Sequence, residues 1–192
     1  IFAADEVARL APYRDIVEAL RQGFRDEIRT PVRHHHDLSP QAILLLMPAW
    51  SRQFTGLKTV VFKSDNAAKG LPTIQASYLL IDNATGATVA MMDGGEITRR
   101  RTAAASALAA DYLARPDAST MTLVGAGALG AHFVRAHASV RPIRKVFIFS
   151  RTRAKSEALA AELAGHGLAA IVTDDLASAV GQSDLVSCVT TS

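Results

Sequence analysis

The sequence predicts an α/β fold in two parts, a mixed α+β domain followed by a doubly wound parallel sheet with helices on its faces. Three observations support this prediction. Strand-like and helix-like segments alternate in the second half, a glycine-rich loop joins the first strand to the first helix there, and the first half instead places strands next to one another. The 192 residues are 49% hydrophobic and 20% charged, which is enough for a core and excludes a disordered chain.

The first half begins with two predicted helices and continues with predicted strands. A short helical turn covers 5–10, and Pro12 opens a second helix that ends before Pro31. In that helix apolar residues recur at helical spacing, namely Ile16, Val17, Leu20 and Phe24. Short apolar or β-branched runs predict strands over 42–47, 58–63, 73–82 and 87–92, the last two joined by a turn.

The second half begins with an alanine-rich helix and then alternates between strands and helices. The helix is predicted over 102–113 because alanine has the highest helix propensity, and Arg115-Pro116 closes it. We expect an α+β domain over 1–101, a linking helix within 102–117 and the parallel-sheet domain over 118–192. Strands are predicted over 121–124, 145–149, 169–172 and 185–189, and helices over 128–139, 152–164 and after Asp174 or Asp175.

Composition excludes several classes of protein. Basic residues exceed acidic ones by only 21 to 18, which is too small an excess to favour a nucleic acid partner. The single cysteine, Cys188, excludes a disulfide scaffold, fits a reducing compartment and is expected to be a buried core thiol. The longest segment without a charged residue, 118–134, is shorter than the ~20 residues of a membrane span, and no leader sequence opens the chain. We therefore expect a cytoplasmic protein without membrane contact.

Residues 124–130 (VGAGALG) contain the pattern GxGxxG directly after a predicted strand and before a predicted helix. In a Rossmann fold Gly125 would form the tight turn, Gly127 would let the backbone approach a pyrophosphate, and Gly130 would pack the helix on the strand. The pattern alone also occurs in turns that bind no ligand, but its context here favours a dinucleotide site. The predicted cofactor-binding residues of this loop are Gly125, Ala126, Gly127, Ala128 and Leu129.

The end of strand 145–149 indicates which dinucleotide binds. Sites that prefer NAD place an acidic residue here to bind the ribose 2′-hydroxyl. This sequence has Ser150, Arg151 and Arg153 instead, which suit a 2′-phosphate through charge-assisted hydrogen bonds; the alternative is a solvated helix start. We therefore expect NADP(H) to be the preferred cofactor, with NAD(H) second. Thr190 follows the last strand, where Rossmann domains approach the nicotinamide ribose.

Four further motifs accompany the glycine loop: Gly56-Leu57-Lys58, 66–72 (NAAKGLP), Asp93-Gly94 and 97–106 (ITRRRTAAAS). Together with 124–127 they resemble the ornithine cyclodeaminase/mu-crystallin family over essentially the whole chain. The resemblance implies an α+β substrate and dimerisation domain, a Rossmann domain for NAD(P), and a homodimer. Because a Rossmann domain usually has six strands and four are predicted here, we expect it to be incomplete at residue 192, with part of the active site beyond.

Within that family, three segments are most similar to bacterial Δ1-pyrroline-2-carboxylate reductases: 98–110 (TRRRTAAASALAA), 125–130 (GAGALG) and 136–143 (AHASVRPI). This resemblance implies NAD(P)H-dependent reduction of Δ1-pyrroline-2-carboxylate or Δ1-piperideine-2-carboxylate to L-proline or L-pipecolate. Two alternatives remain, an ornithine cyclodeaminase and a non-catalytic NADP-dependent binding protein like mu-crystallin. Cyclodeaminases more often carry glutamine at the position of Leu129 and an acid at that of Ser150, which weakens the first alternative.

The resemblance also implies a set of site residues. Arg33 and Lys58 correspond to contacts of the substrate carboxylate, and Thr73, Arg101 and Thr102 to positions near the cofactor and substrate. The chemistry agrees, because an arginine can hold a carboxylate bidentately and a lysine beside the imine can deliver a proton. We therefore predict Lys58 to be catalytic and Arg33, Lys58 and Arg101 to bind substrate.

Two runs of basic side chains have simpler interpretations. His34-His35-His36 lies on an extended segment, where neighbouring side chains point to opposite faces, so at most two could share an ion. No further ligand spacing accompanies them, and we expect a surface or substrate-side role and no metal. Arg99 and Arg100 fit a solvated charge run as well as they fit a site.

Overall fold

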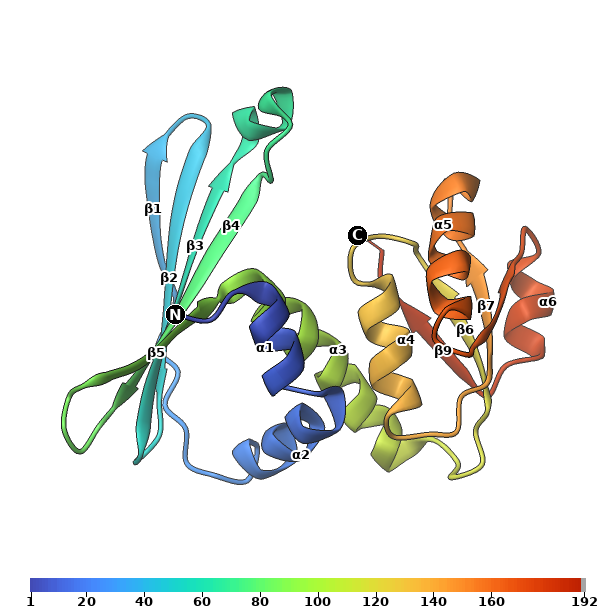
Figure 1. Cartoon of the computed structure of the whole chain (residues 1–192), viewed down its shortest axis with the longest axis horizontal. Coiled ribbons are helices and arrows are strands. Elements are labelled where there is room, and N and C mark those ends of the chain that lie inside the picture. The colour runs from blue at the N-terminus through green and yellow to red at the C-terminus, as the bar shows by residue number, and fades with distance from the viewer. Residues whose placement is uncertain (191–192) are drawn as a thin grey trace. The chain divides into compact units, whose positions relative to one another are not determined.

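The computed structural model describes residues 1–190 and contains two sheets (Figure 1). Contacts between Cα atoms divide the chain into two compact units, 1–12 with 21–98 and 13–20 with 99–192. The sequence placed the boundary after residue 101 and residues 13–20 in the first domain. The difference arises because Tyr13 and Val17 are buried in the core of the second unit.

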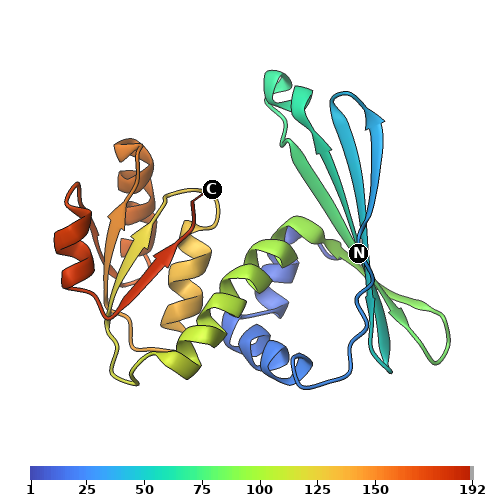
Figure 2. The same cartoon turned by 180° about the vertical axis from the view of Figure 1, so that it is seen from behind.

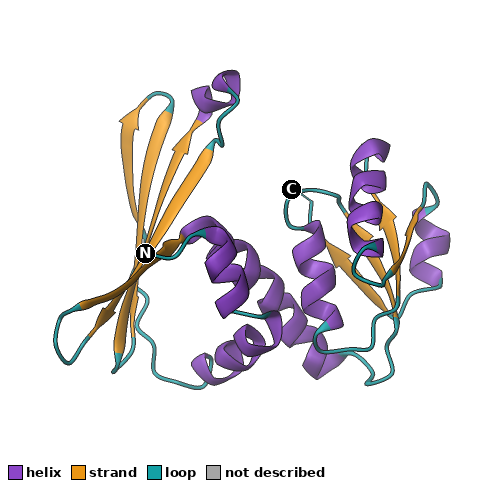
Figure 3. Ribbon diagram, viewed as in Figure 1, coloured by secondary structure: helices purple, strands orange, loops and turns teal. Residues whose placement is uncertain are grey.

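The first unit is built around an antiparallel sheet in the order β1-β2-β3-β4-β5 (Figure 3). Its elements are α1 (Ala4–Leu10), the end of α2 (Tyr13–Gly23), β1 (His34–Ser39), β2 (Ala42–Trp50), β3 (Phe54–Lys63), the 3-10 helix Ser64–Lys69, β4 (Ile74–Asp82) and β5 (Thr88–Asp93). The strands β2 and β3 are longer than predicted. Pro48 fits inside β2 because the pairing with β1 ends at Leu46, so its missing N–H interrupts no ladder on that side.

The second unit contains a parallel sheet in the order β8-β7-β6-β9. Figure 2 shows β6 between β7 and β9. Numbered along the chain this order is 3-2-1-4, the arrangement of the first strands of a dinucleotide-binding fold. The elements are β6 (Thr120–Val124), α4 (Gly130–Ala138), β7 (Lys145–Phe149), α5 (Arg153–Ala164), β8 (Ala169–Val172), α6 (Leu176–Gly181, capped by Asp175) and β9 (Leu185–Cys188).

The core of the second unit lies between this sheet and helices α3, α4 and α5. The central strands contribute Met121 and Leu123 from β6 and Val146 and Ile148 from β7, all at 0% exposure. Small alanines of α3 and the larger side chains of α4 and α5 pack against them. The alternation predicted from the sequence is therefore observed, because buried parallel strands are continuous apolar runs. No helix within residues 1–190 is both long and apolar enough to cross a membrane.

The alanine-rich helix α3 (Gly94–Leu113) begins earlier than the predicted residue 102. The Asp93 carboxylate accepts a 2.6 Å hydrogen bond from the backbone N–H of Glu96 and so caps the first turn. At Gly94 a Cβ would lie 2.8 Å from the backbone nitrogen of Ser77, so only glycine fits where the helix starts. Two adjacent glycines, Gly94 and Gly95, therefore begin the helix.

The longer helix changes the interpretation of the three arginines. Arg101 does not stand at the helix start as predicted but lies inside the helix, and its side chain is exposed. Arg100 is not solvated: it is 8% exposed, and its guanidinium lies 4.6 Å from the centre of the Tyr13 ring. A helix turns 100° per residue, so adjacent arginines cannot share one environment.

One of the two histidines of α4, His137, is buried in the second unit at 3% exposure. Its Nδ1 lies 2.8 Å from the Phe133 carbonyl oxygen, and its ring stacks on that of Phe133. Burial lowers the pKa of His137, an effect only partly opposed by the hydrogen bond to Phe133. The folded protein therefore holds this ring in its neutral form.

The buried histidine predicts that acid destabilises the fold. The unfolded chain binds a proton at His137 near pH 6.5, whereas the folded chain resists it, so stability falls as the pH drops below that value towards the folded pKa. The slope contributed by one such group is at most about 1.4 kcal/mol per pH unit. Urea unfolding between pH 8 and pH 5 should show a shallower slope for His137→Gln than for the wild type. His166→Gln, at an exposed position, should keep the wild-type slope; equal slopes for all three proteins would contradict the prediction.

Candidate functional site

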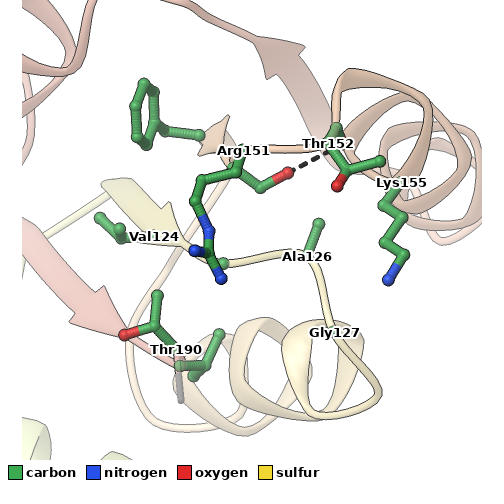
Figure 4. Close-up of a pocket in the computed structure, with 11 residues that line it drawn as sticks. Val124, Ala126, Gly127, Arg151, Thr152, Lys155 and Thr190 are labelled. Carbon is green, nitrogen blue, oxygen red and sulfur yellow. Dashed lines mark hydrogen bonds between the residues drawn. The ribbon is translucent and has the colours of Figure 1, made fainter. Parts of the chain in front are cut away.

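A cavity of about 360 Å³ opens at the carboxyl ends of β6, β7 and β9 in the second unit (Figure 4). Strands β7 and β9 lie on opposite sides of β6, so the chain reverses its direction of travel across the sheet here. Open α/β sheets bind their ligands at this kind of switch point. The lining residues are Val124, Gly125, Ala126, Gly127, Phe149, Ser150, Arg151, Thr152, Lys155, Val189 and Thr190.

Each glycine of the GxGxxG loop has a distinct environment. Gly125 has φ 109°, and a Cβ there would lie 3.0 Å from the Val189 carbonyl oxygen, so a side chain would be strained. At Gly127 a Cβ would meet nothing within 4 Å, which leaves the backbone open to the cavity. At Gly130 a Cβ would lie 2.8 Å from Leu159 of α5, so this glycine permits close helix packing. The structure thus places Gly125 at a turn and Gly130 at a close packing contact, and the approach of Gly127 to a pyrophosphate stays a prediction.

The next two residues of the loop lie away from the main cavity. Helix α4 begins at Gly130 and not at the predicted Ala128, because the Gly130 N–H donates to the Gly127 carbonyl in a turn that precedes the helix. Ala128 instead lines a neighbouring cavity of about 310 Å³ between α4 and α5. Leu129 lines neither cavity and packs against the core.

The polar groups at the end of β7 fix the start of α5. The Ser150 hydroxyl donates to the Thr152 carbonyl at 3.0 Å and lies 2.8 Å from the Ser156 hydroxyl, which is 1% exposed. Arg151 extends from this loop toward the glycine loop (Figure 4). Among residues 1–190 no carboxylate lines the cavity, so the charge that these residues bring to this edge is positive.

Of the basic residues at the start of α5, Lys155 lines the cavity and the predicted Arg153 does not. Arg153 does not line the cavity, because its Nη1 lies 2.6 Å from an Asp174 carboxylate oxygen and its Nε 2.9 Å from one of Glu157. Lys155, which the sequence analysis missed, lines both cavities. Helical side chains lean toward the N-terminus of their helix, so a lysine in the first turn of a helix that begins at the cavity was the signal available.

The end of β9 places Thr190 in the cavity lining, as the sequence analysis expected from its position. Cys188, two residues earlier, is exposed and not a core thiol. The apolar sequence of this strand predicts a buried thiol. In the described part of the chain β9 is an edge strand, paired only with β6, and Val186 on the same strand is also 48% exposed.

The predicted substrate residues of the first unit lie on its sheet. Lys58 is half-buried on β3 and pairs with Met47 on one side and Tyr78 on the other. On the other side of β2, His34 of β1 pairs with Leu46, the residue before Met47. Arg33 directly precedes His34, so Arg33 and Lys58 flank β2 at nearly the same level. The Thr73 carbonyl accepts a hydrogen bond from the backbone N–H of Lys63. Lys63 lies five residues beyond Lys58 on β3, a distance of roughly 16 Å, so the structure does not bring Thr73 close to Lys58.

A tyrosine next to Lys58 was not predicted. At Gly56 a Cβ would lie 1.9 Å from the Tyr78 hydroxyl, so the missing side chain makes room for this ring beside Lys58. Burial raises the pKa of Tyr78, which keeps the phenol neutral. A half-buried lysine beside a neutral phenol is a polar spot on an otherwise apolar stretch of sheet.

The remaining residues considered in the sequence lie on α3 and on β1. Arg101 and the half-buried Thr102 lie on α3. All three histidines of β1 are exposed, with the rings of His34 and His36 6.3 Å apart and His35 3.2 Å from Asp37 on the other face. Within residues 1–190 no three His, Cys, Asp or Glu side chains are grouped so as to hold a metal ion.

Comparison with known proteins agrees with this geometry. A sequence model described as the ornithine cyclodeaminase/mu-crystallin family matches residues 3–192. The Δ1-pyrroline-2-carboxylate reductase of Paracoccus denitrificans is 37% identical over 195 residues, which cover 97% of this chain and 59% of that protein.

Solved structures match the chain over almost its full length. The Δ1-pyrroline-2-carboxylate reductase of Thermococcus litoralis, in complex with NADH and L-proline, superposes with a TM-score of 0.86 at 27% identity, covering 99% of this chain and 61% of that one. An archaeal alanine dehydrogenase dimer with bound NAD gives a TM-score of 0.87 at 27% identity, covering 98% and 59%. The chain thus spans about three fifths of the length of its relatives.

Proposed function

The chain belongs to the ornithine cyclodeaminase/mu-crystallin family, and on that premise we propose that it takes part in the NAD(P)H-dependent reduction of a cyclic imino acid. The proposed substrates are Δ1-pyrroline-2-carboxylate and Δ1-piperideine-2-carboxylate, and the products L-proline and L-pipecolate. The observation that carries the proposal is the cavity at the switch point, where an open glycine loop meets the basic end of β7. The names of the relatives from Paracoccus and Thermococcus support the same reaction class.

We propose NADP(H) as the preferred cofactor and NAD(H) as the second choice. The relatives were solved with NADH and NAD. In this chain, however, the cavity is lined by Arg151 and by no acidic residue, so nothing there would accept a hydrogen bond from a ribose 2′-hydroxyl as a carboxylate does. A guanidinium binds a phosphate group through two parallel, charge-assisted hydrogen bonds.

The proposed chemistry divides between cofactor and protein. The bound reduced nicotinamide supplies a hydride for the imine carbon. Lys58 would donate the proton that the imine nitrogen takes up, and Arg33 would hold the substrate carboxylate bidentately. Arg101, Thr102 and Thr73 remain proposed contacts of substrate or cofactor. Because the related alanine dehydrogenase is a dimer, we also propose that the working protein is a homodimer.

The test is consumption of reduced cofactor by the purified protein. We expect the absorbance of NADPH to fall when either cyclic imine is added, and to fall more slowly with NADH. Gly127→Ala should fold like the wild type, since its Cβ meets nothing within 4 Å, but should bind NADPH at least about tenfold more weakly because the methyl group enters the cavity. Release of ammonia from L-ornithine with catalytic NAD would replace the proposal by a cyclodeaminase, and tight NADPH binding without any turnover would replace it by a binding protein.

A further inference from the structure

Two basic side chains extend toward the glycine loop in Figure 4, Arg151 from the end of β7 and Lys155 from the first turn of α5. We propose that Lys155 determines cofactor specificity by binding the ribose 2′-phosphate together with Arg151, and that Arg153 has no part in this. The inference rests on the proposed function, whose cofactor preference it assigns to particular residues.

The position of Lys155 is fixed by the local structure. Its backbone N–H donates to the Thr152 carbonyl at 3.0 Å, and the next residue, Ser156, is buried against the Ser150 hydroxyl. The first turn of α5 is therefore tied to the end of β7. Figure 4 shows the side chain extending from this turn alongside the glycine loop, where Lys155 lines the cavity together with Arg151.

The charges around the cavity separate Lys155 from Arg153. Within residues 1–190 neither the Arg151 guanidinium nor the Lys155 ammonium makes a hydrogen bond or ion pair. Arg153, in contrast, is held by Glu157 and Asp174. A phosphate bound there would give these two cations a partner, whereas recruiting Arg153 would break two ion pairs.

The acid that shares a cavity with Lys155 is paired with another residue. Glu162 lines the neighbouring cavity together with Lys155, but its carboxylate is paired with Arg135. Thr152 adds a polar group to the site, because it stands at the N-cap of α5 and its side chain makes no capping hydrogen bond. The site thus offers two cations and a hydroxyl, which fits a phosphate monoester, and the cations can only donate to a ribose hydroxyl.

Lys155 also lies near Ala126 and Gly127, the part of the loop expected to approach the pyrophosphate. Binding of Lys155 to the pyrophosphate and binding to the 2′-phosphate have different consequences, because NADPH and NADH share the pyrophosphate and only NADPH has the 2′-phosphate. A lysine that binds the pyrophosphate affects both cofactors equally. One that binds the 2′-phosphate affects NADPH alone.

The experiment measures dissociation constants of NADPH and NADH for the wild type, Lys155→Met and the matched control Arg153→Met, by calorimetry at fixed salt. We expect Lys155→Met to weaken NADPH binding about tenfold, to change NADH binding less than twofold, and to leave the thermal unfolding temperature unchanged. Arg153→Met should keep the wild-type ratio of the two constants. Adenosine 2′-phosphate, which lacks the pyrophosphate, should lose affinity for Lys155→Met in parallel with NADPH.

Each other outcome overturns the inference. Equal losses for both cofactors would assign Lys155 to the pyrophosphate, an unchanged ratio would remove it from the site, and a larger effect of Arg153→Met would restore that residue. The measurement needs no substrate, so a protein that prefers NADPH through Lys155 but reduces no imine would refute the proposed function and leave this inference standing. A wild type that binds neither dinucleotide would refute both.

Discussion

Replacing Lys58 by methionine is expected to lower kcat/KM for the cyclic imino acid about a thousandfold, while cofactor affinity and thermal stability stay close to the wild-type values. Lys58 is half-buried beside Tyr78, so its ammonium is the cation that this stretch of sheet offers to an imine nitrogen or a carboxylate. Methionine keeps the length and the apolar stem of the side chain and removes the charge. Steady-state kinetics with NADPH and either imine measures the effect.

The matched control is Lys63→Met on the same strand. Lys63 lies 3.0 Å from Asp65, whose pKa is about 2 because Lys69 and Lys63 both hydrogen-bond to it, so its charge is used locally. Lys63→Met should therefore retain most of the activity. Comparable losses for both variants would show that Lys58 acts through the stability of the sheet, and full activity of Lys58→Met would remove it from the reaction.

Arg141→Met should lower the free energy of unfolding by about 3–5 kcal/mol, the cost of leaving a buried charge without its partner. The Arg141 side chain is 9% exposed and pairs with the Asp111 carboxylate, which is 20% exposed. It also donates to the carbonyl groups of Asp111 and, at 3.0 Å, Ala114, and so closes the C-terminal end of α3. Removing it takes away this ion pair and the hydrogen bonds to the last carbonyls of a long helix together.

Urea unfolding of the purified protein checks this value, with Arg153→Met as the control. The ion pairs of Arg153 are exposed on both sides, at 57–79% for its partners, so its loss should cost less than about 1 kcal/mol. Similar losses of unfolding free energy for the two variants would mean that the Arg141 ion pair stabilises the fold no more than an exposed ion pair does. The sequence marked residue 141 only through a family resemblance, because the partner Asp111 is distant along the chain.

The sequence alone determined the second unit almost completely. Strands β7 and β8 have the predicted bounds, and β6 and β9 differ by one residue, because each is a short apolar run between polar turns. The glycine loop and its place after β6 followed from the same local pattern, as did Arg151 and Thr190 in the cavity lining. The family match confirms the resemblance inferred from these motifs.

The first unit was harder to predict from the sequence, because its sheet is antiparallel and its edge strand β1 is polar. Strand β1 is exposed at every position, so it has no apolar alternation, and its pairing with β2 is what makes it a strand. The start of α3 could not be predicted either. A glycine is needed at position 94 because the Ser77 backbone lies so close, and that contact is between residues distant in the sequence.

What the sequence by itself determined about this protein is its family, the order of its elements and a glycine-rich loop followed by basic residues. Only the tertiary structure decided which basic side chains line the cavity at that loop. Ser150, Arg151, Arg153 and Lys155 stand within six consecutive positions of the sequence. The ion pairs of Arg153 depend on Asp174, which comes from a different segment. Electrostatic partners are set by distance in space, and a linear pattern of charges does not contain that distance.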